Sequence, residues 1–156
     1  TKNEKVHVRF IEFMPFNGNK WDMSKLVSYA QVMGRAHAKY SKGLIQRLQD
    51  APNDTSKNYK VMGYQGSFSV ISSVTNPFCD SCNRIRLTAN GRLKNCLFSD
   101  GEEDLLTPLR NGKEIEPIIY KLIQGKKKIR NGMETIESFQ EPESHNQNRS
   151  MIAIGG

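Results

Sequence analysis

Residues 79–96 read CDSCNRIRLTANGRLKNC, and they contain all three cysteines of the chain together with four of its Lys and Arg residues. Three thiols cannot all pair as disulfides within one chain, so at least one would stay reduced beside a CxxC pair. An odd cysteine count favours a reducing compartment over a secreted disulfide framework. A bound metal is therefore the first hypothesis for this stretch.

The spacing of Cys79, Cys82 and Cys96 is compatible with two kinds of metal centre. Three thiolates fit a zinc site completed by a histidine, or an iron-sulfur cluster in which one iron has no cysteine ligand. The chain has three histidines, all far from the cysteines in sequence: His7, His37 and His145. None stands at a zinc-ligand spacing, which weakens the zinc interpretation. A stretch that binds no metal is the third alternative.

The residues between the thiols predict a β-hairpin, because polar and apolar side chains alternate on both sides of Asn90-Gly91. A two-residue turn at Asn90-Gly91 would pair Leu87 with Lys94 and mix polar and apolar side chains on both faces. A three-residue turn over residues 89–91, with Gly91 left-handed in a bulge, pairs Leu87 with Leu93 and Arg86 with Lys94 instead. Only the second register separates the faces, so we expect it.

In this register one face of the hairpin is apolar and the other is cationic. The apolar face carries Ile85, Leu87, Leu93 and Leu97. The cationic face carries Arg84, Arg86, Arg92, Lys94 and Cys96, with Arg84 opposite Cys96. Four cations exceed what three thiolates need for neutralisation, and arginine donates paired hydrogen bonds to phosphate. We therefore expect a multiply charged anion here; the alternative is an exposed strand whose cations only aid solubility.

The composition suits one globular unit with long polar loops, since 37% of the 156 residues are hydrophobic. No apolar run reaches the roughly eighteen residues of a membrane span, and the opening TKNEKVHVRF does not resemble a signal peptide. The formal net charge of +7 indicates an anionic partner, which could be nucleic acid, a nucleotide or a membrane surface. We interpret GKKKIR (125–130) as a solvated helix end without a specific role.

The rest of the sequence predicts alternating strands and helices. Residues 6–16 are a dense β-branched and aromatic run that predicts a buried core strand ending at Pro15. Residues 23–40 predict one amphipathic helix. Its expected stripe consists of Leu26, Ala30, Met33 and His37. Residues 49–58 are polar and predict a mobile loop, and residues 59–74 predict two short strands around a turn at Gly63 and Gly66.

Two short helices are expected after the hairpin, in residues 101–112 and 113–125. The second would carry Ile118, Ile119, Leu122 and Ile123 on one side and end at Gly125. Residues 137–150 are predicted to be a polar loop. The closing MIAIGG (151–156) is expected to be extended, so that Ile152 and Ile154 pack while the two terminal glycines enter a narrow space.

Three separated segments resemble the C-terminal part of the GTP 3',8-cyclase family of radical S-adenosylmethionine enzymes. They are RFIEFMPFNGNKWD (9–22), FCDSCNRIRLTANGRLKNCLF (78–98) and NRSMIAIGG (148–156). The resemblance runs from about residue 6 to the last residue, and MPFNGNKW is most similar to eukaryotic members. Three motifs in the family's order make it highly specific.

The resemblance implies an α/β fold, the C-terminal portion of a partial TIM-type (β/α) barrel followed by an α+β iron-sulfur region. It implies a last barrel strand and amphipathic helix in residues 1–48, a mobile loop in 49–58 and a cluster- and GTP-binding region with a Gly-Gly tail in 59–156. The implied activity is a lyase reaction that converts GTP to (8S)-3',8-cyclo-7,8-dihydroguanosine 5'-triphosphate, the first step of molybdenum cofactor biosynthesis.

Residue roles follow from the same match. Cys79, Cys82 and Cys96 correspond to the ligands of the family's second [4Fe-4S] cluster, whose remaining iron takes the purine of GTP. The GTP-binding stretch corresponds to Arg84, Ile85 and Arg86. Met14 falls on the S-adenosylmethionine contact at the end of a barrel strand. Catalytic roles fall on Arg9, Gly155 and Gly156, although a buried ion pair is the preferred interpretation of Arg9.

The sequence departs from the family in one respect, because no CxxxCxxC for the radical-forming cluster occurs in it. We therefore expect a fragment, a separate domain or part of a split enzyme, inactive alone. Expected partners are GTP, the N-terminal radical half, cyclic pyranopterin monophosphate synthase as the next enzyme, and a second copy in a homodimer; nucleic acid and membrane are not expected. The expected compartment is the mitochondrial matrix in a eukaryote and otherwise the cytoplasm.

Two alternatives from other classes of protein stay open. One is a zinc-stabilised basic module that binds RNA or another polyanion. The other is a sulfur-carrier protein that uses the terminal Gly-Gly, although such carriers need no cysteine cluster. Brown colour from iron would favour the enzyme over the zinc module, since zinc is colourless.

Overall fold

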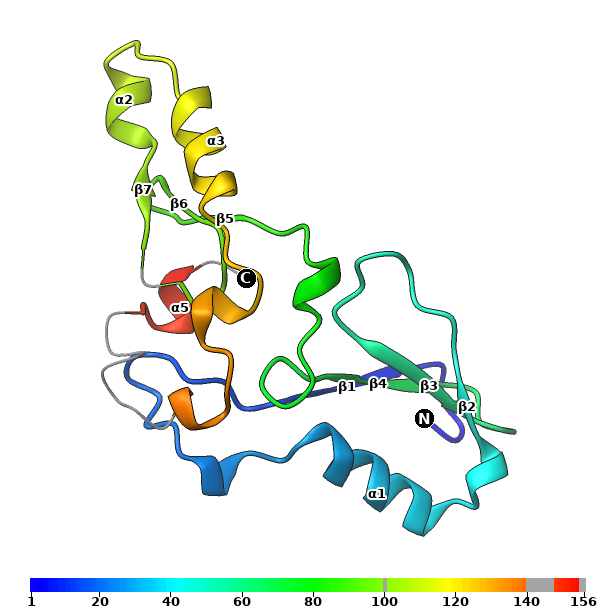
Figure 1. Cartoon of the computed structure of the whole chain (residues 1–156). Helices are drawn as coiled ribbons and strands as arrows, with labels where there is room; N and C mark the ends of the chain where they lie inside the picture. Colours follow the sequence, from blue (N-terminus) through cyan, green and yellow to red (C-terminus); the bar gives the residue numbers. More distant parts are fainter. Residues whose placement is uncertain (100, 140–147, 155–156) are drawn as a thin grey trace. The chain divides into compact units, whose positions relative to one another are not determined.

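The computed structural model describes residues 1–99, 101–139 and 148–154, and it forms a mixed α/β protein with two compact units (Figure 1). Unit 1 comprises Thr1–Met14 and Met23–Cys82, and unit 2 comprises Pro15–Asp22 and Asn83–Gly156. Each unit has its own sheet and its own apolar core. The predicted division into residues 1–48, 49–58 and 59–156 was based on function, and the two compact units do not test it. In the described part of the chain no helix has the length and hydropathy to cross a membrane.

Unit 1 is built on a four-stranded mixed sheet in the order β1-β4-β3-β2. The strands are β1 (His7–Ile11), β2 (Ile45–Arg47), β3 (Lys57–Val61) and β4 (Ser67–Ile71). Strand β1 runs parallel to β4, and the other neighbours are antiparallel. The two strands expected around Gly63 are confirmed, and Gly63 has the left-handed φ of +79° that favours glycine at this turn. Strand β2 was not predicted.

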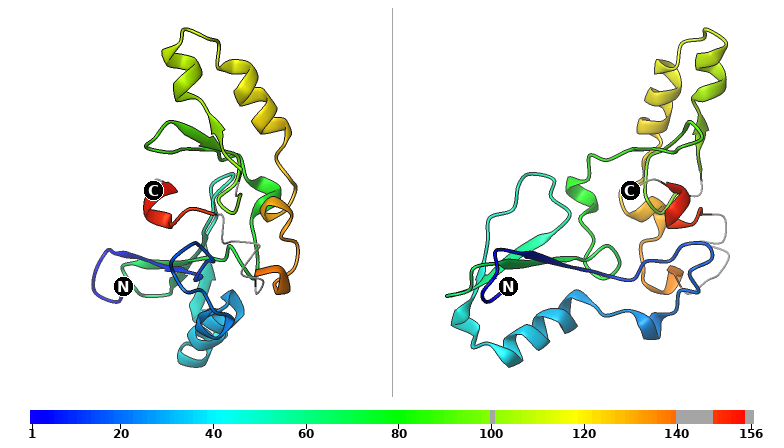
Figure 2. Two further views of the ribbon diagram at one scale, coloured as in Figure 1. Left: turned by 90° about the vertical axis from the view of Figure 1, so that its left-hand side faces the viewer. Right: turned by 180° about the vertical axis from the view of Figure 1, so that it is seen from behind.

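Helix α1 (Tyr29–Lys39) lies along the sheet of unit 1 (Figures 1 and 2). The helix is shorter than the predicted 23–40, because Ser28 and Gln31 form a capping box that fixes its first residue at Tyr29. Met33 is buried against Tyr59, Val61, Phe68 and Val70. The predicted stripe is partly wrong, since Ala30 is exposed. Tyr29, Val32, Ala36 and Tyr40 pack beside Met33 instead.

Strand β1 contradicts the prediction of a buried core strand, because all five of its residues are exposed. It stands at the edge of the sheet, and among the described residues only β4 pairs with it, whereas Met33 of α1 packs over β3 and β4. Val8, Phe10 and Ile11 therefore remain on the surface of the described structure. An apolar composition predicted a strand correctly here, but burial also requires a neighbouring layer.

Unit 2 contains a three-stranded antiparallel sheet in the order β5-β6-β7 with two helices beside it (Figures 1 and 2). The strands are β5 (Arg86–Leu87), β6 (Arg92–Lys94) and β7 (Glu103–Asp104). The helices in the described part of this unit are α2 (Leu106–Arg110), α3 (Glu116–Gln124) and α5 (Met151–Ile154). Short 3-10 turns occupy Met23–Lys25, Lys42–Leu44, Cys79–Ser81, Arg130–Gly132 and Glu137–Phe139 in the two units.

The two helices predicted after the hairpin are confirmed with shorter bounds. Residues 103–104 form strand β7 rather than the start of a helix. Helix α3 ends at Gly125 as expected, and Leu122 is buried with Leu93 and Leu105. Ile118 and Ile119 pack on this core, whereas Ile123 is exposed.

The C-terminal segment is helical where an extended segment was expected. The Ala153 amide donates to the Ser150 carbonyl at 2.9 Å, which closes a turn at the start of α5. Side chains two residues apart point to different sides of a helix. Ile154 is therefore 1% exposed while Ile152 is 96% exposed. Gly155 and Gly156 lie outside the described residues.

Candidate metal centre and its flanking hairpin

All three cysteines are reduced and half-buried. Cys79 opens a 3-10 turn in unit 1, and the Cys82 amide donates to the Cys79 carbonyl at 3.1 Å, so the CxxC pair is held in one compact turn. Cys96 follows strand β6 in unit 2. Within either unit, the described residues contain no group of three or more His, Cys, Asp or Glu side chains placed to hold a metal ion.

The described histidines have other surroundings. The His7 ring on β1 contacts two hydroxyls of β4, with Nδ1 at 2.6 Å from Ser67 Oγ and Nε2 at 3.1 Å from Ser69 Oγ. His37 lies on helix α1, and His145 is outside the described residues. Both ring nitrogens of His7 are thus in contact with serine hydroxyls.

The segment that leads to Cys79 is held by a buried carboxylate that the sequence interpretation missed. Glu12 follows β1 and is 3% exposed. Its carboxylate accepts from the backbone amides of Val74 and Thr75 at 2.8 Å each, and from the Thr75 hydroxyl. It also accepts from the Tyr29 amide at 2.9 Å, at the start of α1. Glu12 therefore joins the end of β1, the first turn of α1 and the loop before the CxxC turn.

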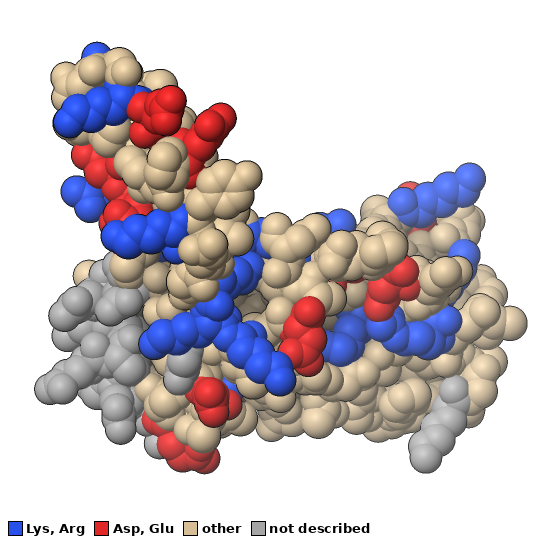
Figure 3. Space-filling model, turned by 45° about the horizontal axis from the view of Figure 1, so that its top comes forward, with Lys and Arg blue, Asp and Glu red and all other residues tan. Residues whose placement is uncertain are grey.

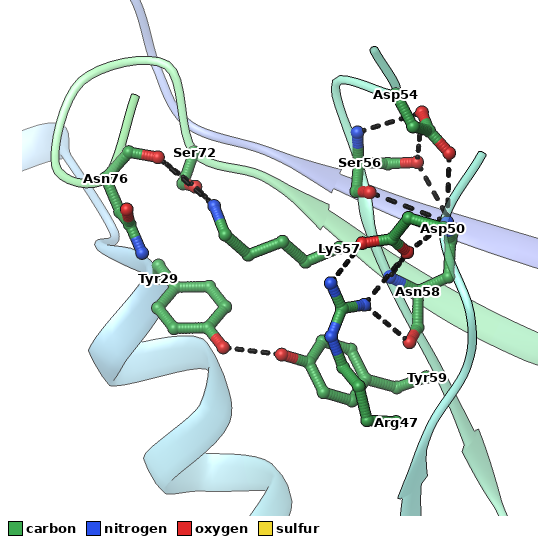
Figure 4. A network of polar contacts seen from close by, with 10 residues as sticks. All are labelled: Tyr29, Arg47, Asp50, Asp54, Ser56, Lys57, Asn58, Tyr59, Ser72 and Asn76. Atoms are coloured by element: carbon green, nitrogen blue, oxygen red, sulfur yellow. Dashed lines mark hydrogen bonds and ion pairs between the residues drawn. The ribbon is translucent and has the colours of Figure 1, made fainter. Parts of the chain in front are cut away.

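Lys57 holds the same loop from strand β3 (Figure 4). Its ammonium donates to Ser72 Oγ at 2.8 Å and to the Asn76 carbonyl at 3.2 Å, and Ser72 Oγ also donates to that carbonyl. The nitrogen lies 5.3 Å from the centre of the Tyr29 ring. Burial lowers the pKa of Lys57 from its ordinary value. Two polar anchors, Glu12 and Lys57, thus fix residues 72–76.

The loop before β3 is closed by carboxylates (Figure 4). Asp50 accepts from the Arg47 guanidinium and from the Asn58 backbone and side chain. Burial alone would raise the pKa of Asp50, but these hydrogen bonds outweigh it and hold the pKa below its ordinary value. Asp54 accepts from the Ser56 amide at 3.1 Å, which is the largest cause of its lowered pKa. The segment expected to be mobile therefore has defined internal contacts.

The three-residue hairpin turn is confirmed. Arg86 stands opposite Lys94 and Leu87 opposite Leu93. Gly91 has a left-handed φ of +74°, the Thr88 amide donates to the Arg92 carbonyl at 2.8 Å, and the Gly91 amide donates to the Thr88 carbonyl at 2.9 Å. The pairing of Arg84 with Cys96 lies beyond the strand ends and stays a prediction.

The two faces of the hairpin differ from the expected apolar and cationic surfaces. Lys94 is fully buried, so it is not one of the surface cations that were expected to receive an anion. Arg84 and Arg86 are half-buried and Arg92 is exposed. On the apolar face Leu93 enters the core, whereas Ile85 and Leu87 are exposed. Leu93 lies on the central strand β6, where it packs with Leu105 and Leu122, whereas Leu87 lies on the edge strand β5 and Ile85 precedes it.

The basic run 125–130 has structural contacts that the sequence interpretation did not expect. Lys126 donates to the Arg84 carbonyl at 3.0 Å and so fixes the backbone at the entry to β5. Arg130 is buried, and its guanidinium donates to the carbonyls of Met133 and Glu134 at 2.8 and 2.6 Å. Only part of the run is therefore a solvated helix end.

The other predicted site residues have separate surroundings. Met14 is half-buried shortly after β1. Arg9 is exposed in the middle of β1 opposite Ser69, so its interpretation as a buried ion-pair partner is wrong. On the face shown in Figure 3, Asp and Glu side chains lie among the Lys and Arg side chains. The positive charge on that face is therefore not one continuous patch.

Comparison with known proteins gives consistent matches. Residues 6–132 match the family described as Molybdenum Cofactor Synthesis C. The chain is 43% identical to a mitochondrial GTP 3',8-cyclase of Arabidopsis thaliana, with 100% of the chain and 38% of the relative covered. It is 38% identical to molybdenum cofactor biosynthesis protein 1 of Homo sapiens, with 99% and 23% covered. It is 34% identical to a GTP 3',8-cyclase of Rhodopirellula baltica, with 98% and 42% covered. The chain spans less than half the length of each of these relatives.

Proposed function

Because the chain belongs to the Molybdenum Cofactor Synthesis C family, we propose that it is the C-terminal, GTP-binding part of a GTP 3',8-cyclase. The complete enzyme would be the radical S-adenosylmethionine lyase that converts GTP to (8S)-3',8-cyclo-7,8-dihydroguanosine 5'-triphosphate. Two of the relatives above carry this enzyme's name and match nearly the whole chain. The step that forms the radical would require the N-terminal part of the enzyme.

The observation that carries this proposal is the register of the hairpin. Arg86 stands opposite Lys94 in this register. Arg84 precedes β5, and we expect it to share the face of Arg86 because residues two apart in an extended segment point the same way. Lys126 fixes the backbone at Arg84, which restricts the direction of its side chain. Two neighbouring guanidinium groups can each donate paired hydrogen bonds to phosphate oxygens. Arg84, Ile85 and Arg86 would therefore bind the triphosphate of GTP.

The donor set fits a [4Fe-4S] cluster held by Cys79, Cys82 and Cys96. All three thiols are reduced, and the one described histidine on a strand has both ring nitrogens engaged with serines. Thiolates are the usual ligands of such clusters. When bound, the cluster would supply one iron without a cysteine ligand as a position for the purine. Glu12 and Lys57 would keep the CxxC turn in place by holding the loop before it.

Met14 would contact S-adenosylmethionine, and Arg9 would act near the substrate together with Gly155 and Gly156. Met14 and Arg9 belong to the strand β1 segment, at whose carboxyl end a barrel enzyme binds its ligands. Arg9 is exposed and so accessible to a ligand. The role of the two glycines rests on the family's C-terminal sequence.

Strand β1 favours the partial TIM-type barrel as the finer fold. It runs parallel to β4, it stands at the sheet edge, and its apolar side chains are exposed. A groove of about 640 Å³ in unit 1 is lined by apolar residues of β1, β4 and α1. In the complete enzyme a preceding strand would pair with β1, and a preceding helix would cover the groove.

The proposed cellular setting is the mitochondrial matrix in a eukaryote and otherwise the cytoplasm. The mitochondrial name of the plant relative supports the first of these. The product would pass to cyclic pyranopterin monophosphate synthase, and a homodimer would be the functional assembly.

The function is tested in the complete enzyme, in which this chain follows its N-terminal part. The anaerobically reconstituted parent should form the cyclised nucleotide from GTP, and Cys96→Ser should lose that product together with close to one cluster's content of iron. Ser81→Ala is the matched control, because Ser81 is an exposed residue inside the CxxC turn. Stoichiometric zinc that iron cannot replace, without turnover of GTP, would contradict the proposal and favour a zinc-stabilised module.

A further inference from the structure

Lys94 is a buried cation with a complete set of partners inside unit 2. The side chain is 0% exposed. Its ammonium donates to the Ser99 carbonyl and, at 3.1 Å, to the Asn148 side-chain oxygen, and it lies 3.6 Å from the Glu102 carboxylate. Isolated charges are rarely buried, because removing one charge from water costs roughly several kcal/mol. This lysine is buried two residues before Cys96.

The partners of Lys94 lead directly to the C-terminal segment. Asn148 is 1% exposed, and its amide nitrogen donates to the Leu97 carbonyl at 3.1 Å. The next residue, Arg149, binds Glu102 with both arms of its guanidinium, with Nε 2.6 Å from one carboxylate oxygen and Nη2 2.7 Å from the other. Residues 94–102 and residues 148–149 are thus joined by four polar contacts, although about fifty residues separate them in sequence.

A stabilising role alone does not account for a lysine at this place. Apolar side chains of similar volume often replace a buried ion pair with no loss of stability. A hydrogen-bonded ion pair differs from apolar packing because it accepts only one geometry. The contacts therefore specify where residues 148–149 lie relative to the strand that leads into Cys96.

We propose that Lys94, Glu102, Asn148 and Arg149 form a C-terminal anchor that positions the tail of the protein against the cysteine-bearing strand. The anchor fixes the start of the tail, and α5 with its buried Ile154 continues from it. These four are positioning residues that act through Gly155 and Gly156. Only the expected effect of the anchor on GTP turnover rests on the proposed function.

The structural part is tested by trypsin, which cleaves after Arg149 and releases the peptide that begins with SMIAIGG. In the complete enzyme, brief digestion at low trypsin is followed by mass spectrometry, and the initial release rate is measured. Lys94→Met and Asn148→Leu should release the peptide about ten to a hundred times faster, because each removes a hydrogen bond to a charged group that holds residue 148. Lys128→Met is the control, because Lys128 is exposed and should leave the rate unchanged.

The assay needs neither GTP nor a cluster, so it distinguishes failure of the anchor from failure of the proposed function. If Lys94→Met does not fold, Asn148→Leu decides, because it removes the same bond from the other side. Parental release rates in the folded variants would overturn the anchor.

The positioning role is tested separately in an enzyme that turns over GTP. Asn148→Leu should lower kcat at least about tenfold, with KM for GTP and iron content close to parental values. Asn148→Asp keeps an oxygen for Lys94 but loses the donor to the Leu97 carbonyl, so it should restore part of the rate. Loss of iron in parallel with kcat, or no rescue by Asn148→Asp, would contradict a positioning role.

Discussion

Replacing Glu12 by Gln should open the loop that leads to the CxxC turn. The substitution keeps the size of the side chain but replaces one carboxylate oxygen by an amide NH2 group, which donates hydrogen bonds. Glu12 accepts from the amides of Tyr29, Val74 and Thr75 and from the Thr75 hydroxyl. The glutamine oxygen can accept only from the donors on one side. One or two buried donors on the other side therefore lose their acceptor and face the amide NH2 group.

The size of the effect follows from those lost bonds. A buried donor left without a partner costs about 1 to 3 kcal/mol. Two such donors lower the free energy of local opening by about 2 to 6 kcal/mol, so their exchange rates rise at least about thirtyfold. The effect should be local, because the core of unit 1 around Met33 does not contain Glu12.

Native-state hydrogen exchange measures this directly at the amides of Tyr29, Val74 and Thr75. Glu4→Gln is the control, because Glu4 is an exposed residue in the same unit. If the three amides of Glu12→Gln exchange at the parental rate, the carboxylate does not hold the loop and the reasoning is refuted.

Two further predictions concern the hairpin and the loop before β3. Gly91→Ala should destabilise unit 2 for two reasons. The left-handed backbone of residue 91 costs about 1 to 2 kcal/mol for alanine, and the added Cβ, which would lie 2.5 Å from Leu106 Cβ, adds a further cost. Gly112→Ala, also at positive φ but in open space, should cost less in urea unfolding; equal costs would contradict the close contact. The carboxyl of Asp54 should titrate below its ordinary pKa of 3.8, because the Ser56 amide bonds the charged form. Its stabilising contribution is then present above about pH 4 and is lost as the pH falls through the lowered pKa. An NMR titration of that carboxyl with a midpoint at or above 3.8 would be inconsistent with the bond.

The hairpin shows what the sequence could predict. Alternation around Asn90-Gly91 selected one of two registers, and the structure has that register with Gly91 left-handed. Local alternation is enough here because a shift of one residue would exchange the faces of the whole strand. The same reasoning could not predict that Lys94 is buried, because its partners Glu102 and Asn148 come from segments that local patterns do not connect.

The candidate site also separates what local sequence patterns can predict from what depends on contacts between distant segments. The three cysteines and Arg84 and Arg86 were proposed from residue type, spacing and the family resemblance, and their roles stay predictions. Glu12 and Lys57 were missed, because their roles depend on amides and hydroxyls brought to them by the fold. One signal was present for Glu12: a carboxylate stands within an apolar run, RFIEFMPF, where a buried polar residue needs partners. The burial of β1 was predicted wrongly, since the sequence does not say which strands stand at an edge.

The central claim, that the face with Arg84 and Arg86 binds GTP beside a cluster, is tested most directly by calorimetric titration of GTP into the anaerobic, cluster-loaded enzyme. Arg84→Ala and Arg86→Ala should each weaken binding by about 1.5 to 3 kcal/mol, the loss expected for a hydrogen bond to a charged group. Arg92→Ala is the comparison, because Arg92 is exposed next to the turn and should matter less. Binding of GTP by both variants with parental affinity would contradict the claim.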